Sequence, residues 1–530
     1  MSTFKPLDGM RKKLHSTTGA YEGVVDQNGD AAFPAAALSA SEVPALQSLV
    51  SPDGIPQRGF ALGDSITNRQ YQPLSTVTTT VSGSSLIFTS ASAAVPVGAG
   101  VRVTNQTAIY DEVGTVTASG ASGFTALFSR DLTGLVSGTC NLYIYSRGND
   151  TGWLNYARGL LAQQGKPINI VANEAVGGAK VAEMLVRLRT KIIPRATLGD
   201  VLWFMGGIND VEVTDTSTTG APNTIATIKT IFDEALAAGM VVHASTVTPA
   251  QASGYFAVAS TGLAQIAAIN GYIRARCAAE ANAVCFDSWA AIQSGGSYAA
   301  AGLIETSGVH PLPAGAAAIG ARYVTDCGSS IRKGKFRRWM SVADNYVDST
   351  SWNLLTNCEF TGATGATPPT GWVTSGTSTT FTLSDGAVTG KDLSIAKASV
   401  AGNATILSQD ITARVSAGDR LLFGTEQETV TIGQGHYLNC DLVFTVGGVE
   451  QIFGIGRQQF TVLLGGSLPP AGSRWFHEWV AGANDGRGGV VVPAGFTSAL
   501  FRYTLRQDSV GVCEVKVARP HVYKAGSALA

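Results

Sequence analysis

A serine and a histidine stand in sequence contexts that could support nucleophilic catalysis. Ser65 follows the apolar run 59–62 and a Gly-Asp pair, a pattern that predicts a strand ending in a sharp turn. A serine hydroxyl is a weak nucleophile at neutral pH and needs a base within hydrogen-bond reach. His310, followed by Pro311, is the histidine whose motif suits that role. Each residue taken alone has another reading, because Ser65 could be a helix N-cap and His310 a surface histidine.

The other histidines and the cysteines favour no second type of chemistry. The remaining histidines lie in an N-terminal arm, in an apolar run expected to be a strand, and in the C-terminal part of the chain; they are His15, His243, His436, His477 and His521. The seven cysteines are scattered and form no C-x-x-C pair, so we expect small buried side chains rather than disulfides or a zinc site. No metal-binding or phosphate-binding motif is present, and we expect no metal and no cofactor.

The pattern of apolar runs predicts the elements that must position these residues. Helical periodicity alternates with five apolar runs, at 59–62, 168–172, 201–205, 241–247 and 283–286. Such an alternation predicts a parallel sheet covered by helices on both faces. Functional residues of such sheets lie at the carboxyl ends of the strands, which is where Ser65 stands.

Changes in composition divide the chain into segments. We expect an N-terminal arm at 1–55, an α/β domain at 56–75 and 148–335, an all-β insert at 76–147 and a β-sandwich or jelly roll at 345–530. The insert is rich in Thr, Val, Ser and Gly, and the C-terminal part has almost no helical period. A basic run at 332–338 fits a solvated linker better than a site for an anionic partner.

Charge and hydropathy limit the classes of partner. The net charge is −1 and the pI about 6.6, which favours neither nucleic acid nor an anionic membrane surface. No apolar stretch is long enough to insert into a membrane. The first 20 residues carry Lys and Arg without an apolar segment, so no signal peptide is expected. We therefore expect a cytosolic protein, or one that leaves the cell by another route, for instance on a virus particle.

Four segments resemble, in order, the sequence blocks of the SGNH/GDSL hydrolase family. They are FALGDSIT at 60–67, NEAVGGA at 173–179, GIND at 207–210 and SGVHP at 307–311. The resemblance implies a three-layer α/β/α, flavodoxin-like domain with a five-stranded parallel sheet and a serine esterase activity. It also implies that Ser65 is the nucleophile and His310 the base. The backbone N–H groups of Ser65 and Gly178 and the side-chain amide of Asn209 would then form the oxyanion hole.

One position departs from the family pattern. The family has an Asp three residues before the histidine, and this chain has Ser307 there. Three hypotheses remain open. Ser65 and His310 could act as a dyad, with Ser307 or a carbonyl orienting the ring; Glu305 could reach the ring through a changed loop; or the site could be impaired. The dyad is preferred, because Glu305 stands in the wrong register.

The C-terminal part resembles jelly-roll carbohydrate-binding modules, through NLLTN at 353–357 and PPTGW at 368–372. Three tryptophans could stack on sugar rings or be core aromatics: Trp372, Trp475 and Trp479. The whole chain resembles phage tail fibre or tailspike esterases. This resemblance implies removal of O-acetyl groups from a capsule or O-antigen polysaccharide by a virion tail or extracellular protein, as a homo-oligomer and a trimer if a fibre. The alternatives are a weak or inactive glycan-binding fibre protein and a lipase or thioesterase of the same family.

Overall fold

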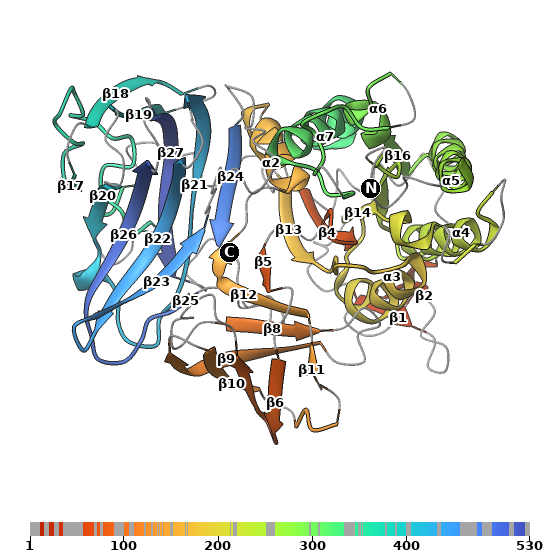
Figure 1. The fold of residues 1–530 in the computed structure, drawn as a ribbon, viewed down its shortest axis with the longest axis horizontal. Coiled ribbons are helices and arrows are strands. Elements are labelled where there is room, and N and C mark those ends of the chain that lie inside the picture. The colour runs from red at the N-terminus through yellow and green to blue at the C-terminus, as the bar shows by residue number, and fades with distance from the viewer. Residues whose placement is uncertain are drawn as a thin grey trace, which may run out of the picture.

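The computed structural model of the chain shows an α/β unit, a β insert and a C-terminal β unit (Figure 1). It describes residues 11–14, 21–25, 31–34, 57–67, 71–74, 78–89, 100–104, 111–120, 123–128, 131–134, 136, 138–139, 141–148, 152–164, 166, 168–211, 214–215, 220–250, 260–295, 298–305, 308–332, 345–347, 351, 353–376, 379–386, 390–398, 404–431, 436–455, 474–479, 490–507 and 513–524.

The α/β unit is built on a five-stranded parallel sheet. Its strands are β4 (Gln57–Gly63), β13 (Ile168–Asn173), β14 (Val201–Met205), β15 (Val241–Ser245) and β16 (Ala283–Phe286). They are ordered β13-β4-β14-β15-β16. Counted along the chain this order is 2-1-3-4-5, the flavodoxin-like order. The predicted fold class is therefore confirmed.

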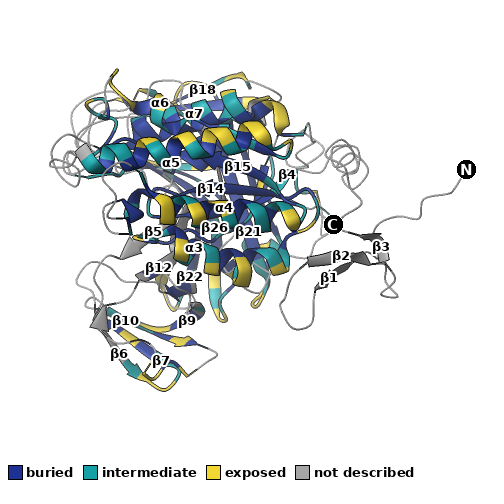
Figure 2. Ribbon diagram, turned by 90° about the vertical axis from the view of Figure 1, so that its right-hand side faces the viewer, coloured by how far each residue is buried: buried dark blue, intermediate teal, exposed yellow. Residues whose placement is uncertain are grey.

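Helices cover both faces of this sheet. They are α2 (Trp153–Gln163), α3 (Val181–Arg187), α4 (Pro222–Ala237), α5 (Ser260–Ala279), α6 (Ser288–Ile292) and α7 (Pro313–Cys327). The helices α2 and α7 lie on one face, and α3, α4 and α5 lie on the other, with their exposed sides turned outward in Figure 2. Because both faces are covered, the three central strands β4, β14 and β15 are buried along almost their whole length, which explains their largely apolar runs.

Two glycines allow β4 to lie close to β14. A Cβ atom at Gly59 would lie 2.4 Å from the Val201 carbonyl oxygen, and one at Gly63 would lie 2.4 Å from the Met205 carbonyl oxygen. No side chain fits at such distances, so only glycine is compatible with this strand pairing. Gly63 is the last residue of β4, and the tight packing there determines where the following turn begins.

His243 is a structural residue of this core. It is fully buried on β15, with its Nδ1 atom 2.8 Å from the Tyr323 hydroxyl and its Nε2 atom 3.0 Å from the Ser330 hydroxyl. The Trp203 indole N–H donates to the same Tyr323 hydroxyl over 2.7 Å. Burial lowers the pKa of His243 to about 3, so the ring is neutral and committed to this chain of hydrogen bonds.

The insert between β4 and α2 is an antiparallel sheet. Its strands are β6 (Thr78–Ser82), β7 (Ser85–Thr89), β8 (Gly100–Thr104), β9 (Asp111–Gly120), β10 (Gly123–Phe128), β11 (Gly138–Thr139) and β12 (Asn141–Gly148). They are ordered β11-β6-β7-β10-β9-β8-β12, and β5 (Tyr71–Leu74) also pairs with β12. One face carries a stacked Phe88–Phe124 pair. Upstream, β1 (Arg11–Leu14), β2 (Tyr21–Val25) and β3 (Ala31–Pro34) form a separate sheet.

The C-terminal unit consists of two antiparallel sheets around an apolar core. One sheet is ordered β23-β22-β26-β20-β17, with β17 (Val373–Ser375), β20 (Ala404–Asp410), β22 (His436–Val446), β23 (Val449–Ile455) and β26 (Phe496–Gln507). The other is ordered β18-β19-β27-β21-β24, with β18 (Thr379–Asp385), β19 (Lys391–Lys397), β21 (Arg420–Thr431), β24 (Arg474–Trp479) and β27 (Cys513–Lys524); β25 (Val490–Val491) pairs with β21.

The three units are joined through their secondary structure. In Figure 1 the helix α2 lies beside β24. The insert strand β12 pairs in parallel with β23 at Arg147 and Gly454, which makes the insert sheet continuous with one sheet of the C-terminal unit.

The cysteines of the described residues form no disulfides. The six cysteines in the described part of the chain are free, and all but Cys285 are buried, as expected for small core side chains. Among the described residues, no helix has the length and apolarity needed to cross a membrane.

Candidate active site

Ser65 lies in the turn that follows β4, at the carboxyl edge of the parallel sheet. The Asp64 carboxylate accepts a 2.9 Å hydrogen bond from the Ile66 N–H, which closes an Asx-type turn around Ser65. Asp64 is buried, whereas Ser65 is only half-buried. The turn therefore holds its acidic residue inside the protein and keeps the hydroxyl accessible.

His310 and Glu305 complete a chain of polar contacts to this hydroxyl. The His310 Nε2 atom lies 2.8 Å from the Ser65 Oγ atom, and the His310 Nδ1 atom lies 3.3 Å from the Glu305 Oε2 atom. In the tautomer that fits both contacts, Nδ1–H donates to the carboxylate and Nε2 accepts from the serine hydroxyl. This arrangement of a nucleophile, a base and an orienting carboxylate is the geometry of a serine-hydrolase triad.

A tight hairpin explains why Glu305 reaches the ring from five residues away. Ile304 and Pro311 form an antiparallel bridge, and the Glu305 N–H donates to the His310 carbonyl over 3.0 Å. A Cβ atom at Gly308 would lie 3.2 Å from Glu305 Oε2, so the glycine leaves room for the carboxylate. The sequence-based preference for a dyad without a carboxylate is thus corrected.

Ser307, the other residue considered for orienting the ring, lies outside the described residues. The family pattern places the carboxylate three residues before the histidine, whereas Glu305 lies five residues before His310. The Gly-Val pair before His310 could have signalled a hairpin, in which residues distant in sequence face each other.

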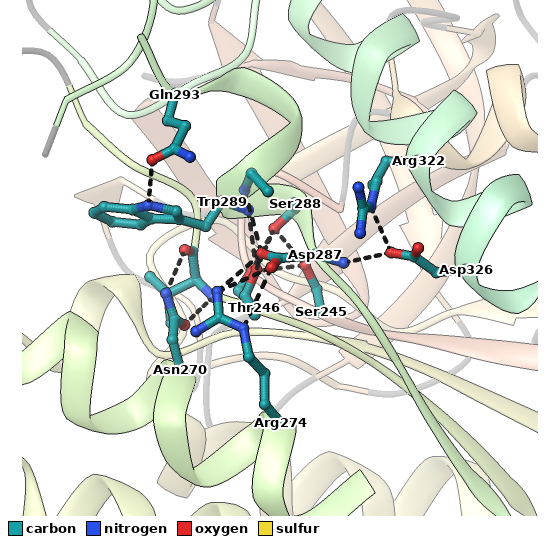
Figure 3. A network of polar contacts seen from close by, with 12 residues as sticks. Ser245, Thr246, Asn270, Arg274, Asp287, Ser288, Trp289, Gln293, Arg322 and Asp326 are labelled. Carbon is teal, nitrogen blue, oxygen red and sulfur yellow. Dashed lines mark hydrogen bonds and ion pairs between the residues drawn. The ribbon is translucent and has the colours of Figure 1, made fainter. Parts of the chain in front are cut away.

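The loop that carries Glu305 and His310 begins at α6, and a polar network fixes the start of α6 (Figure 3). Asp287 accepts hydrogen bonds from the Ala290 N–H (3.2 Å) and the Thr246 hydroxyl (3.0 Å) and forms an ion pair with Arg274 of α5. Its own N–H donates to Asp326 of α7 over 2.9 Å. The Asp287 carboxylate therefore links the residue after β15 with α5 and α6, and the Asp287 backbone N–H adds a link to α7.

Replacement of Asp287 by alanine is expected to lower the free energy of unfolding by about 2–3 kcal/mol, because it removes a helix cap and two further acceptor contacts. Urea-induced unfolding measures this change. Asp287→Asn keeps the cap acceptor and should cost less. Asp233→Ala, which removes the ion pairs of a 39 % exposed carboxylate, is the control and should cost under about 1 kcal/mol. An equal loss in the Asp287 and Asp233 variants would contradict the role of this network.

Gly178 lies in a turn that packs next to the nucleophile. The Ala179 N–H donates to the Val176 carbonyl over 3.1 Å, and Gly178 has a φ of +75°. A positive φ at the third position of such a turn is the type II geometry that glycine fills without strain. A Cβ atom at the neighbouring Gly177 would lie 3.9 Å from the Ser65 Cβ atom, so this turn lies directly against Ser65.

The segment that precedes this turn is bonded at two points to the residues on either side of Ser65. The Val176 N–H donates to the Gly63 carbonyl (3.0 Å), and the Asn173 amide donates to the Thr67 carbonyl (3.0 Å). The same Asn173 side chain accepts from the Ala175 N–H over 3.0 Å. Residues 173–179, named the oxyanion loop below, are thereby held in register with Ser65.

Asn209 follows β14 in a 3-10 turn (Ile208–Asp210) that begins at Gly207, whose φ is +113°. Its side-chain amide donates to the Ala179 carbonyl over 3.1 Å. An amide nitrogen carries two hydrogens, so this bond is compatible with donation to a substrate oxygen. The structure thus brings Gly178 and Asn209 together at the edge of the sheet where Ser65 lies.

Two buried carboxyl groups beside the site have raised pKa values. Burial raises the pKa of Asp64 to about 7; the Ile66 N–H and His310 oppose this shift, and Asp210 adds to it. Burial also raises the pKa of Asp210 to about 6, although the Val181 N–H and Thr214 stabilise its charged form. Asp64 is the stronger candidate for a pH effect on stability, because no described group bonds its Oδ2 atom.

Asp64→Asn should change how stability depends on pH. The folded-state pKa of Asp64 is raised above its ordinary value of 3.8 to about 7, so the contribution of this group to stability is fully present below its ordinary pKa and is lost as the pH rises through about 7. Asparagine cannot ionise and keeps the acceptor for the Ile66 N–H. Between pH 5 and pH 8 the stability difference should shift by about 2–3 kcal/mol in favour of the variant. Urea unfolding at both pH values measures it, and a pH-independent difference would contradict the prediction.

Trp372, one of the three tryptophans predicted as possible sugar-binding residues, lies in the protein interior. Trp372 is buried in the C-terminal core, where it stacks on Tyr503 at 6.0 Å and packs against Phe360 and Phe501. A buried ring cannot stack on a sugar, so the prediction for Trp372 is corrected: it is a core aromatic. Trp475 and Trp479 lie on β24, and their side chains lie outside the described residues.

The described residues contain no group of three His, Cys, Asp or Glu side chains arranged to hold a metal ion. The site described above contains a hydroxyl, an imidazole, a carboxylate and amide donors. On a flavodoxin-like sheet, these groups define the class of hydrolases that attack carbonyl carbon with a serine.

The comparison with protein families agrees with this class. Residues 135–318 match the model of the GDSL-like Lipase/Acylhydrolase family, so the chain contains a GDSL-like acylhydrolase domain. The matched segment includes the oxyanion loop, Asn209 and His310. Ser65 precedes it, on the other side of most of the β insert. No curated protein sequence matches the chain.

Three solved structures are similar to parts of the chain. The enzymatically active domain of Bacteriophage CBA120 tailspike protein 4 has 14 % identity and a TM-score of 0.23, over 33 % of this chain and 22 % of that one. A GDSL-like lipase from Bacteroides thetaiotaomicron has 21 % identity and a TM-score of 0.26, over 30 % and 76 %. The CBM22-1 xylan-binding domain from Paenibacillus barcinonensis has 13 % identity and a TM-score of 0.22, over 30 % and 88 %. The chain thus spans about a fifth of the tailspike that it matches.

Proposed function

We propose that this protein is a serine esterase that removes O-acetyl groups from a polysaccharide of the capsule or O-antigen type. The observation that carries the proposal is the continuous chain of contacts from Glu305 through His310 to the Ser65 hydroxyl. A serine with a base at 2.8 Å and amide donors nearby is equipped to attack an ester carbonyl.

The reaction proceeds through an acetyl-enzyme. Ser65 Oγ attacks the acetyl carbonyl carbon while His310 Nε2 takes the hydroxyl proton, and Glu305 stabilises the imidazolium. The N–H groups of Ser65 and Gly178 and the Asn209 amide stabilise the oxyanion. Collapse breaks the bond to the sugar oxygen, which receives the proton from His310. Water, deprotonated by His310, then attacks the acetyl-enzyme; the bond between the acetyl carbon and Ser65 Oγ breaks, Oγ receives the proton from His310, and acetic acid leaves, which ionises to acetate at neutral pH.

The C-terminal unit supports a carbohydrate as the substrate. Two facing antiparallel sheets form a β-sandwich, the architecture of many sugar-binding modules, and the sequence of this unit resembles such modules. The contact between α2 and β24 attaches it to the hydrolase domain. We propose the division 56–75 and 148–335 for the hydrolase domain, 76–147 for the insert and 345–530 for the sugar-binding module, with residues 1–55 as an attachment arm.

The proposed setting is the tail of a virus particle, with the chain as a homo-oligomer. It rests on the order of arm, esterase, β insert and sugar-binding-like module, which resembles tail fibre and tailspike esterases. Mass measurement of the purified chain by light scattering tests the oligomer, and a trimer is expected for a fibre.

The test of function is acetate release. Wild type and Ser65→Ala are incubated with p-nitrophenyl acetate, p-nitrophenyl butyrate and O-acetylated capsule polysaccharides. Release of nitrophenol and acetate by wild type alone supports the proposal. A preference for long acyl chains with no acetate from polysaccharide would favour a lipase or thioesterase. Binding of polysaccharide without hydrolysis of any ester would favour an inactive glycan-binding fibre protein.

A further inference from the structure

The insert strand β8 presents different residues on its two faces. Val101 and Val103 are fully buried and belong to the same apolar cluster as Phe88 of the insert. Because side chains alternate along a strand, Arg102 and Thr104 point to the other face. Both are buried there as well, and both contact the hydrolase domain.

Arg102 reaches the beginning of the oxyanion loop. Its Nη2 atom donates to the Glu174 Oε2 atom over 2.8 Å, and its Nη1 atom donates to the Asn173 carbonyl over 3.3 Å. The Arg102 side chain is 6 % exposed and that of Glu174 is 3 % exposed, so the pair is shielded from water. A guanidinium with two contacts fixes both the side chain and the backbone of this segment.

Glu174 is a junction of several arginines. Arg187 of α3 lies 3.6 Å from its Oε2 atom, and Arg195 pairs with its Oε1 atom. Arg187 also donates to the Thr104 hydroxyl over 2.7 Å. The insert and the helices of the hydrolase domain thus meet at one buried carboxylate, four residues before Gly178. The backbone of Glu174 is also fixed, because its N–H donates to the Ala61 carbonyl of β4, the strand that leads to Ser65, over 2.8 Å.

We propose that Arg102 is a positioning residue for the oxyanion hole, acting through Glu174 and the Asn173 carbonyl. The β insert is then a working part of the catalytic unit, because it supplies one of the three arginines that pair with Glu174. This inference rests on the proposed esterase function. Arg102 touches no reacting atom; it holds the loop from which the Gly178 N–H is presented.

The kinetic test uses Arg102→Met, Arg102→Lys and Arg58→Met. Arg102→Met should lower kcat by about 10- to 100-fold with little change in KM, because a misplaced oxyanion donor weakens the transition state more than substrate binding. Arg102→Lys keeps the charge and should recover part of the loss. Arg58→Met removes an ion pair with Asp200 at the amino end of β4 and should leave kcat unchanged. An unchanged kcat in Arg102→Met would overturn the proposal.

A double-mutant cycle tests whether Arg102 acts through Glu174. On the Glu174→Gln background, Arg102→Met should lower kcat by less than about 2-fold, because coupled residues are not additive. Equal losses on both backgrounds would overturn the proposed route.

Hydrogen exchange separates this proposal from the esterase proposal. Amides of peptides spanning 173–179 should exchange faster in Arg102→Met than in wild type or Arg58→Met, whether or not any ester is hydrolysed. If wild type hydrolyses no ester but this exchange accelerates, the function fails while the positioning contact stands. If wild type is active and exchange in 173–179 is unchanged in Arg102→Met, the positioning role is overturned.

Discussion

His310→Ala should lower kcat for p-nitrophenyl acetate by about 10⁴-fold or more, with a small change in KM. The His310 Nε2 atom lies 2.8 Å from the Ser65 hydroxyl, where it can take the proton as the serine attacks. Without the ring, the hydroxyl remains protonated at neutral pH and attacks poorly. Initial rates measured against substrate concentration give both parameters.

Chemical rescue provides the control for His310→Ala. Alanine leaves space where the half-buried ring stood, so added imidazole should restore part of the turnover in His310→Ala and none in Ser65→Ala. A thermal unfolding midpoint equal to that of wild type would show that both variants are folded. Turnover of His310→Ala close to that of wild type would remove His310 from the mechanism.

Glu305→Gln should lower kcat by about 10²- to 10⁴-fold, the second largest effect. Glutamine has nearly the same shape but carries no charge, so it no longer stabilises the imidazolium. It can also present its amide N–H groups to Nδ1 and favour the wrong tautomer. The 3.3 Å contact between Nδ1 and Oε2 is the basis for this expectation. KM should change little, since the effect is on a charge that develops in the transition state.

Glu234→Gln is the matched control for Glu305→Gln. Both side chains are 30 % exposed, and Glu234 pairs with Arg189 at the surface, away from the site. Glu234→Gln should leave kcat unchanged. Were Glu305→Gln as active as Glu234→Gln, the carboxylate would have no role and a Ser65–His310 dyad would be the mechanism. Ser307→Asp would then be the next variant, as it restores the family pattern.

Much of the fold could be predicted because it depends on local patterns. The central strands of the parallel sheet, β4, β14 and β15, are buried on both faces and therefore have largely apolar sequences. The helices α2, α4 and α7 show their apolar periodicity directly. The short helix α6 was not predicted, because five residues are too few to show a period and its stability comes from Asp287.

The candidate site was predictable where the chemistry is local. Ser65, Gly178 and Asn209 each follow a strand, and strand ends meet at one edge of a parallel sheet. Such residues can be found from sequence, because each of them follows, within a few residues, the strand that positions it.

Two features of the site and the C-terminal unit depended on tertiary structure. Glu305 reaches His310 only because a hairpin pairs Ile304 with Pro311. Trp372 is a core residue because the two C-terminal sheets close over it, and its sequence context is the same for a buried and an exposed ring.

The contact that Arg102 makes could not be predicted from local sequence either, because its partner is far away in the chain. It meets Glu174 across 72 positions of sequence, by way of a strand in another sheet. The strands of this protein, and the functional residues that follow them directly, could thus be predicted from local sequence, because neighbours in the chain position these side chains. Tertiary packing determined which residues Glu305, Trp372 and Arg102 contact. A contact between distant segments depends on how whole helices and strands pack together, and it leaves no periodic pattern in the sequence of either segment.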